Sequence, residues 1–416
     1  MNIKHLMCLI CGKEYQPDEV AYVCPDHGNE GILDVVYDYG RIAQSFSKEN
    51  LSKNPDPTIW RYKPLLPVGM ATAVPPLAVG GTPLYDAERL AKRVGVKKLW
   101  VKDDGRNPTA SFKDRASAVA VVKAQEAKAD VVTTASTGNA AAALSGICAS
   151  VGQKNVIFVP KSAPEAKIAQ LLTLGSTVML VDGSYDDAFE LCLEAADAYG
   201  WYNRNTGFNP YMTEGKKTVS FEIAEQLNWQ LPDFLFVSVG DGCIIGGVHK
   251  GFKDLLALGW IDQIPKLVGV QADGSNFLAE AWSNGEDVLY KAPISANTVA
   301  DSISAGLPRD RLKALAAVNN TDGAYITVTD DEILNAIPRL AQGCGVFAEP
   351  AGAAAYAGLL KAVEMKMIGA DDTVVVVNTG NGLKDIQAAM KGVESVDIRP
   401  FLIQPKLEEV RKVVGG

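Results

Sequence analysis

The sequence predicts an α/β protein with parallel sheets, on two observations. Short segments rich in valine and isoleucine, apolar on both faces, alternate along the chain with amphipathic segments of helical period. This alternation is typical of parallel strands that are buried between helices. The chain also has 416 residues, enough for two or three domains at roughly 150 residues each.

Seven segments fit buried strands, and turn residues or helical segments separate them. The predicted strands are residues 98–103, 130–135, 155–160, 177–182, 233–239, 266–272 and 373–377. Residues 185–199 and 215–227 have the period of amphipathic helices. Before the first strand, the prolines of 54–57 and 64–76 predict an extended arm, because proline fixes φ and removes a hydrogen-bond donor.

Charge and composition exclude several classes of function. Lys+Arg 40 against Asp+Glu 49 gives a formal net charge of −9, so without a strong basic block we expect no nucleic-acid partner. No apolar run reaches the roughly 18 residues of a membrane span, and the N-terminus has no apolar signal core. We therefore expect a cytoplasmic protein without a membrane partner. Seven cysteines are too few for a disulfide framework in so long a chain.

The first 38 residues differ from the rest and predict a zinc-ribbon-like module. Cys8 and Cys11 form a Cys-x2-Cys pair, and Cys24 and His27 repeat the spacing. Two such turns hold a tetrahedral zinc ion, which stabilises a segment too short for a large core. The alternative is a small β-module that binds no metal. The pattern favours zinc only slightly, since Asp26 stands where a fourth cysteine would complete it.

Two of four polar loops that follow predicted strands carry candidate substrate chemistry. Lys113 opens a helix and is a candidate Schiff-base nucleophile, although taken alone a lysine at a helix start is more often a surface residue. The second loop lies at the N-terminus of an alanine-rich helix. Its N–H groups and hydroxyls suit a carboxylate or simply cap the helix. Its residues are Ser136, Thr137, Gly138 and Asn139.

The other two loops suit a phosphate and a heteroaromatic nitrogen. A glycine-rich loop after residues 233–239 lets the backbone approach a phosphate at the next helix N-terminus. It comprises Gly240, Asp241, Gly242, Cys243 and Ile244, and it is neither a dinucleotide GxGxxG motif nor a Walker loop. Thr379, after residues 373–377, offers a hydroxyl to a ring nitrogen. Taken singly, either loop is also compatible with a plain turn.

Together, these loops resemble the threonine synthase family of fold-type-II pyridoxal-phosphate enzymes. The likeness includes the N-terminal cysteines, residues 61–67, 81–84 and 349–352, and so covers nearly the whole chain. It implies a homodimer and a cofactor held between two α/β domains. We expect a large domain at 39–125 and 205–416 and a small inserted domain at 126–204.

The resemblance also implies a role for each loop. Lys113, beside Phe112, matches the lysine that bonds the cofactor aldehyde, and Asn139 matches the partner of the phenolic oxygen. Residues 240–244 match the cofactor-phosphate loop, and Thr379 matches the partner of the pyridine nitrogen. A neutral hydroxyl there leaves the ring nitrogen largely unprotonated, which suits elimination over transamination. The expected contacts of a small amino-acid substrate are Ser136, Thr137, Gly138 and Asn209.

Two residues depart from the threonine synthase pattern. Met212 stands where the family carries an arginine for the side-chain phosphate of O-phosphohomoserine, and methionine carries no charge. Arg204, or Lys216 and Lys217, could supply that charge from another direction. The alternative is that the two lysines lie on a solvated helix face. Asp241 stands where the family usually carries asparagine, and its carboxylate repels a phosphate unless it points away.

We therefore expect a pyridoxal-phosphate-dependent lyase that eliminates or replaces a β- or γ-substituent of a small amino acid, with threonine synthase as the favoured activity. Serine/threonine dehydratase is the alternative, because it needs no substrate-phosphate pocket. A non-catalytic binding protein of the same fold is the alternative from another class. The intact lysine and both anion loops argue against that last alternative.

Overall fold

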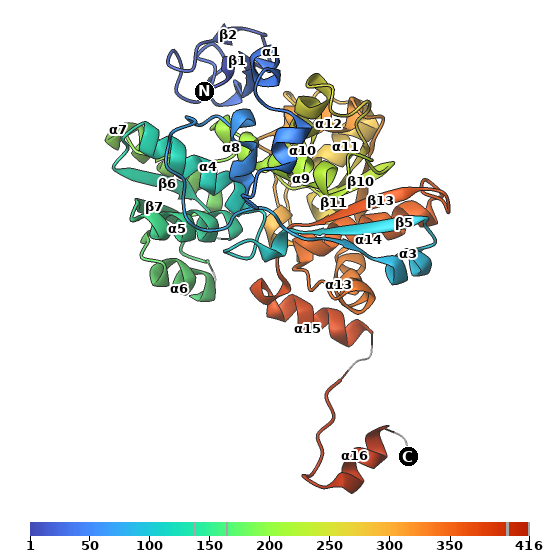
Figure 1. Ribbon diagram of the computed structural model, residues 1–416. Helices are drawn as coiled ribbons and strands as arrows, with labels where there is room; N and C mark the ends of the chain where they lie inside the picture. The colour runs from blue at the N-terminus through green and yellow to red at the C-terminus, as the bar shows by residue number, and fades with distance from the viewer. Residues whose placement is uncertain (137, 164, 397–398, 415–416) are drawn as a thin grey trace.

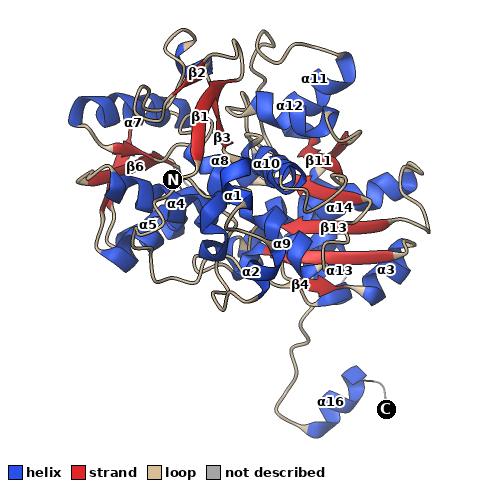
Figure 2. Cartoon of the chain, turned by 45° about the horizontal axis from the view of Figure 1, so that its top comes forward, coloured by secondary structure: helices blue, strands red, loops and turns tan. Residues whose placement is uncertain are grey.

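Three sheets organise the computed structural model, which describes residues 1–136, 138–163, 165–396 and 399–414. In Figure 1 the three-stranded sheet lies at the top beside the N-terminus, the four-stranded sheet on the left and the six-stranded sheet on the right. Figure 2 shows helices on either side of the strands. The predicted α/β class with parallel sheets is confirmed.

The six-stranded sheet has the order β12-β11-β10-β13-β5-β4, and all its pairs are parallel except β4–β5. Its strands are β4 Leu84–Asp86, β5 Lys98–Asp103, β10 Phe234–Ser238, β11 Lys266–Ala272, β12 Ala324–Val328 and β13 Thr373–Asn378. Its helices are α3 Glu88–Val94, α4 Lys113–Glu126, α9 Thr218–Gln226, α10 Cys243–Ala257, α11 Phe277–Asn284, α12 Arg311–Asn319, α13 Asp330–Cys344, α14 Pro350–Glu364 and α15 Ile386–Ser395.

The central strands bury both faces, as their continuous apolar sequence predicts. Leu235, Val237 and Val375 belong to the core cluster that includes α10, whereas Phe236 and Val374 belong to the cluster that includes α14. This division follows from the two-residue period of a strand, which sends neighbouring side chains to opposite faces.

The four-stranded sheet has the order β8-β7-β6-β9, and its strands are parallel. It is built from β6 Val131–Ala135, β7 Lys154–Pro160, β8 Thr177–Val181 and β9 Tyr202–Asn203, with α5 Asn139–Val151, α6 Glu165–Thr173 and α7 Tyr185–Tyr199. All these elements fall within the inserted segment that the sequence analysis placed at 126–204. The exact domain boundaries stay a prediction.

The N-terminal module is an antiparallel sheet with the order β2-β1-β3. Its elements are β1 Ile3–Cys8, β2 Glu14–Tyr15, β3 Leu33–Tyr37, α1 Tyr39–Ala43 and α2 Lys48–Ser52. Tyr37 donates a hydrogen bond of 2.7 Å to Glu214, and Tyr39 donates one of 2.7 Å to Asp254. The module therefore packs on α8 (Tyr211–Lys216) and α10.

Three details differ from the predicted elements. The prediction of an extended arm without a helix was wrong at residues 59–65, which form 3-10 turns on either side of a kink at Tyr62. Pro64 lies in the first turn after the kink, where its missing N–H has no helical partner. The helix predicted at 215–227 begins earlier and is divided at Lys217 into α8 and α9. The edge strands β4 and β12 were not predicted.

The C-terminal helix α16 (Leu407–Val414) buries none of its residues and lies away from the rest of the chain in both views (Figures 1 and 2). Across the part of the chain that the structure describes, no helix is both long and apolar enough to cross a bilayer.

Candidate active site

The predicted catalytic lysine lies where the start of α4 meets the end of β13. The Phe112 N–H donates a 2.9 Å hydrogen bond to the Thr379 carbonyl, and Ser111 forms a β-bridge with Gly380. Phe112 is fully buried and Thr379 is 6% exposed. These backbone contacts bring two predicted site residues together across more than half of the sequence.

The amine of Lys113 makes no hydrogen bond to any described residue. Burial lowers its pKa, and the charge of Arg204 lowers it further, while Cys243, Asp241 and Glu349 act in the opposite direction. A lowered pKa raises the fraction of neutral amine, the form that attacks an aldehyde or accepts a proton. The same interactions place charges of the glycine-rich loop and of Glu349 in the neighbourhood of the lysine.

The glycine-rich loop leads directly into α10. Gly242 has φ +86°, which suits glycine, and a Cβ on Gly240 would lie 2.7 Å from the Cα of Ile303. Cys243 and Ile244 are buried in the first turn of the helix. The free N–H groups of that turn form an anion site.

The carboxylate of Asp241 bonds the segment that precedes α12. Its Oδ1 accepts a 3.4 Å hydrogen bond from the Arg309 N–H, and its carbonyl accepts one of 2.9 Å from the Asp310 N–H. Burial raises the pKa of this carboxyl, while the Arg309 N–H and the charges of Lys113 and Lys216 act in the opposite direction. These nearby cations offset part of the repulsion that the sequence predicts between Asp241 and a phosphate.

Asn139 contacts a carboxylate that the sequence analysis did not assign to the site. Its Nδ2 donates a 2.6 Å hydrogen bond to Glu349 Oε1 and a weaker one of 3.4 Å to Ser302. Glu349 is 5% exposed, and burial raises its pKa, against Lys384 and the bond from Asn139. The family resemblance included residues 349–352, but no role was expected for Glu349, which precedes the proline that starts α14.

The predicted substrate residues occupy different environments. Ser136 Oγ accepts a 3.2 Å hydrogen bond from the N–H of Gly138, which is the N-cap of α5. Thr137 lies outside the described residues. Asn209 is 2% exposed, donates to the Asn203 carbonyl at 2.8 Å and accepts from the Tyr211 N–H at 3.0 Å. Its side chain thus orders the loop before α8.

The four residues considered for the substrate phosphate also separate clearly. Met212 is fully buried in the main core. Arg204 donates to Ser117 at 3.2 Å and to Thr206 at 3.0 Å. Lys217 bonds Glu214 and Asp254, and its ammonium lies 3.9 Å from the centre of the Tyr37 ring. Lys216 is fully buried, and its Nζ has no hydrogen-bond partner among the described residues.

These residues fit pyridoxal phosphate. Ser111 Oγ beside Lys113, Ser238 Oγ at the end of β10 and Lys216 Nζ are all buried without hydrogen-bond partners in the described chain. Buried polar atoms are rarely left unpaired in a native protein, so unpaired groups beside Lys113, at the end of β10 and against α10 are consistent with a polar ligand. The loop at the start of α10 would hold the phosphate, and Lys113 would bond the aldehyde.

A separate cluster lies in the N-terminal module. The ligand atoms of Cys8, Cys11, Cys24 and His27 all lie within 4.8 Å of one another. His27 Nδ1 is 3.5 Å from the sulfur of Cys24 and 3.9 Å from that of Cys8. Ligand atoms of a tetrahedral zinc ion lie about 3.5–3.8 Å apart, so a small contraction would complete the geometry.

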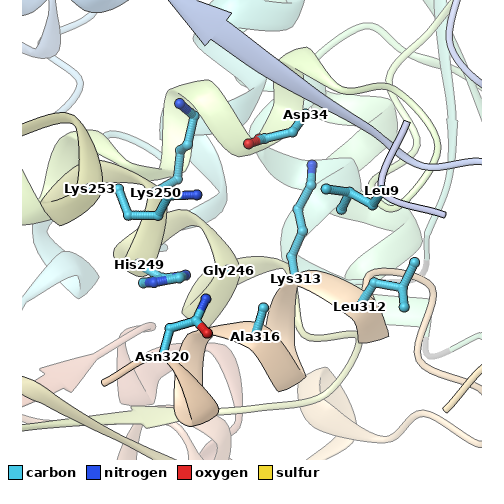
Figure 3. A pocket seen from close by; sticks show the side chains of 10 residues that line it. All are labelled: Leu9, Asp34, Gly246, His249, Lys250, Lys253, Leu312, Lys313, Ala316 and Asn320. Carbon is cyan, nitrogen blue, oxygen red and sulfur yellow. The ribbon is translucent and has the colours of Figure 1, made fainter. Parts of the chain in front are cut away.

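A cavity of about 190 Å³ lies between this module, α10 and α12. Figure 3 shows Leu9 and Asp34 from the module, with His249 and Lys253 from α10. Lys113 does not line it, so this cavity is distinct from the candidate active site. Burial lowers the pKa of His249 to about 4, with help from Lys253, so this imidazole is neutral at physiological pH.

Comparison with known proteins decides the family. Residues 76–380 match the family described as "Pyridoxal-phosphate dependent enzyme". The chain is 39% identical to the threonine synthase of Methanocaldococcus jannaschii over 98% of each chain. It is 40% identical to that of Methanosarcina acetivorans over 99% of each. The chain belongs to the threonine synthase family of pyridoxal-phosphate-dependent enzymes.

Solved structures agree with this family at the level of the fold. The processed form of threonine deaminase isoform 2 from Solanum lycopersicum aligns with a TM-score of 0.64 at 25% identity, covering 76% of this chain and 88% of that one. Diaminopropionate ammonia lyase from Escherichia coli aligns with a TM-score of 0.66 at 19% identity, covering 85% and 93%. The fold-type-II prediction is confirmed.

Proposed function

We propose that this enzyme converts a phosphorylated small amino acid, O-phosphohomoserine, to threonine. The observation that carries the proposal is the convergence of the lysine at the start of α4, the anion loop of α10 and the buried, unpartnered Lys216. A dehydratase needs only one phosphate-binding site, which holds the phosphate of the cofactor. A site for a phosphorylated substrate needs additional positive charge, and Lys216 and Arg204 offer it.

Each residue of the site would have a separate task. Bound pyridoxal phosphate supplies an aldehyde for a lysine amine and a ring that takes up electron density from the substrate Cα. Lys113, with its lowered pKa, would move the proton at that Cα. The N–H groups and hydroxyls at the start of α5 would orient the substrate carboxylate. The hydroxyl of Thr379 would meet the ring nitrogen.

One assay panel tests the proposal. Purified enzyme is given O-phosphohomoserine, serine, threonine and O-acetylserine, while phosphate, ammonia and acetate release are measured. The expected result is phosphate release with formation of threonine from O-phosphohomoserine. Ammonia release from threonine or serine, without phosphate release, would replace the proposal with the dehydratase.

We also propose that the N-terminal module binds one zinc ion through Cys8, Cys11, Cys24 and His27. Support comes from the close approach of their ligand atoms. Metal analysis of protein never exposed to chelator should find about one zinc per chain in the wild type and much less in Cys8→Ser. The catalytic rate should be retained in Cys8→Ser, because the module supplies no residue to the candidate site. Absence of metal from the wild type would refute this second proposal.

A further inference from the structure

Lys216 is an exception among the buried lysines of this protein. Its side chain is fully buried, yet Nζ has no hydrogen bond and no ion pair within 4.0 Å among the described residues. A buried ammonium without a partner carries a large desolvation cost. Native proteins retain such a group where a ligand compensates that cost.

The surroundings of Lys216 are positively charged. The groups that act most strongly on its ammonium are Cys243, Lys113, Arg204 and Asp310. Two of these are cations and one is a carboxylate, and burial raises the pKa of the Cys243 thiol, which keeps it neutral. Lys216 also acts on Asp241, so with the ammonium itself three positive charges face two carboxylates. This excess of positive charge favours an anion as the ligand.

The position of Lys216 determines where that anion sits. A Cβ on Gly247 would lie only 2.7 Å from Lys216 Cβ, so the lysine packs directly against the first turns of α10. The influence of Cys243 on the ammonium places the charge near the N-terminal end of the same helix. The N–H groups at a helix N-terminus and a lysine ammonium together bind a phosphate group strongly.

We infer that Lys216 is a phosphate-binding residue that supplies positive charge to a phosphate monoester at the N-terminal end of α10. The inference rests on the proposed function, because that function provides two such groups, one on the cofactor and one on the substrate. Lys217 is excluded from this task because Glu214 and Asp254 already neutralise it. Met212, one helical turn before Lys216, carries no charge.

The test compares Lys216→Met and Lys216→Arg with Lys253→Met, an exposed lysine of α10 that serves as the control. Dissociation constants are measured by titrating each apoprotein with pyridoxal phosphate and with pyridoxal, which lacks the phosphate. The KM for O-phosphohomoserine and inhibition by inorganic phosphate are measured on the holoenzymes. Losing one charge-assisted bond should weaken the affected ligand roughly tenfold to hundredfold.

Each outcome has a defined meaning. Weaker pyridoxal phosphate with unchanged pyridoxal, in Lys216→Met alone, assigns Lys216 to the cofactor phosphate. Unchanged cofactor with a raised KM and weaker phosphate inhibition assigns it to the substrate phosphate. Unchanged values for every ligand overturn the inference, while a wild-type protein that binds no pyridoxal phosphate overturns the proposed function instead.

Thermal unfolding of the apoproteins separates binding from a structural role. Apo Lys216→Met should unfold at the wild-type temperature or above it, because the substitution removes an unpaired buried charge. Lys216→Arg should retain binding within about threefold, since it keeps the charge. If Lys216→Met is instead unstable and Lys216→Arg binds every phosphate ligand as weakly as the methionine variant, the lysine is structural and the inference fails.

Discussion

Two groups of buried charges differ in whether the protein itself neutralises them. Behind the candidate site, Arg115 bonds both Asp104 and Glu222 at 2.5–2.9 Å, and Lys102 bonds Glu222 at 2.6 Å. All four side chains are at most 3% exposed. Every charge in this network is neutralised within the protein, so the network needs no ligand and holds α4, β5 and α9 together.

In the candidate site, by contrast, Lys113 and Lys216 have no hydrogen-bond partner among the described residues. Arg115 lies two residues after Lys113, and Lys217 immediately follows Lys216. Arg115 and Lys217 are nevertheless fully paired with carboxylates. The paired charges stabilise the fold, whereas we propose that the unpaired charges bind a ligand. Four substitutions test this distinction, with expected effects that decrease from Lys113→Ala to Thr379→Ala.

Lys113→Ala should have the largest effect, because it removes both the amine proposed to bond the cofactor and the base proposed at the substrate Cα. Loss of proton transfer alone costs about 10²- to 10⁴-fold in rate. The rate of phosphate release measures the effect, with protein stability followed in parallel. Normal turnover by Lys113→Ala would show that the lysine assignment is wrong.

Glu222→Gln tests the paired network. It leaves Arg115 and Lys102 buried with less negative charge, and breaking a buried ion pair in this way costs about 3–5 kcal/mol of unfolding free energy. Urea unfolding measures the loss. Glu88→Gln, in an exposed pair with Lys92, is the matched control, for which no measurable loss is expected. A loss below 1 kcal/mol in Glu222→Gln would contradict the structural role of the network.

The pH dependence of anion binding tests the unpaired group. Burial lowers the pKa of Lys216 to about 8, with the charges of Lys113 and Arg204 acting in the same direction against Cys243 and Asp310. The cation is therefore present below pH 8 and lost above it. Sulfate, which does not titrate in this range, should bind the apoprotein more weakly at pH 9 than at pH 7. Lys216→Met should bind sulfate weakly at both values, with a smaller change between them. An equal pH dependence in both proteins would contradict the assignment.

The same lowered pKa has a consequence for stability. Between pH 8 and the ordinary lysine pKa, the unfolded chain binds more protons at this position than the folded chain does. The ligand-free fold is therefore destabilised by Lys216 at neutral pH, and this penalty disappears as pH rises through that window.

Thr379→Ala should have the smallest effect of the four. It removes the neutral hydrogen bond that we propose to the cofactor ring, which corresponds to roughly a twofold to tenfold loss. Steady-state rates measure it, together with the absorption spectrum of the bound cofactor, which a change at the ring nitrogen should alter. A loss as large as that of Lys113→Ala would mean that Thr379 does more than contact the ring.

Much of the fold was predictable because buried parallel strands have a strong local signal. Strands β5 and β11 and helix α7 have the predicted limits. The 3-10 helix at 59–65 was missed because its support is tertiary, including a 2.6 Å bond from Arg61 to Glu225. Edge strand β12 was missed because only its pairing with β11 distinguishes it from a loop.

The candidate site was predictable only where a motif begins a helix. Lys113, Asn139 and the loop before α10 all have that local signal. Glu349 was missed because its role depends on contact with Asn139, 210 residues away. Lys216 and Lys217 were indistinguishable in sequence, since only the structure shows that Lys217 pairs with Asp254 while Lys216 packs beside Gly247 without a partner.

The central claim is that Lys113 bonds pyridoxal phosphate beside a set of unpaired charges. The most direct measurement is borohydride reduction of the purified enzyme, followed by mass analysis of its peptides. The account predicts that the visible absorption disappears and that the mass of the cofactor is fixed on the peptide that contains Lys113. A colourless protein that cannot be reconstituted with pyridoxal phosphate, or a label on a different lysine, would contradict it.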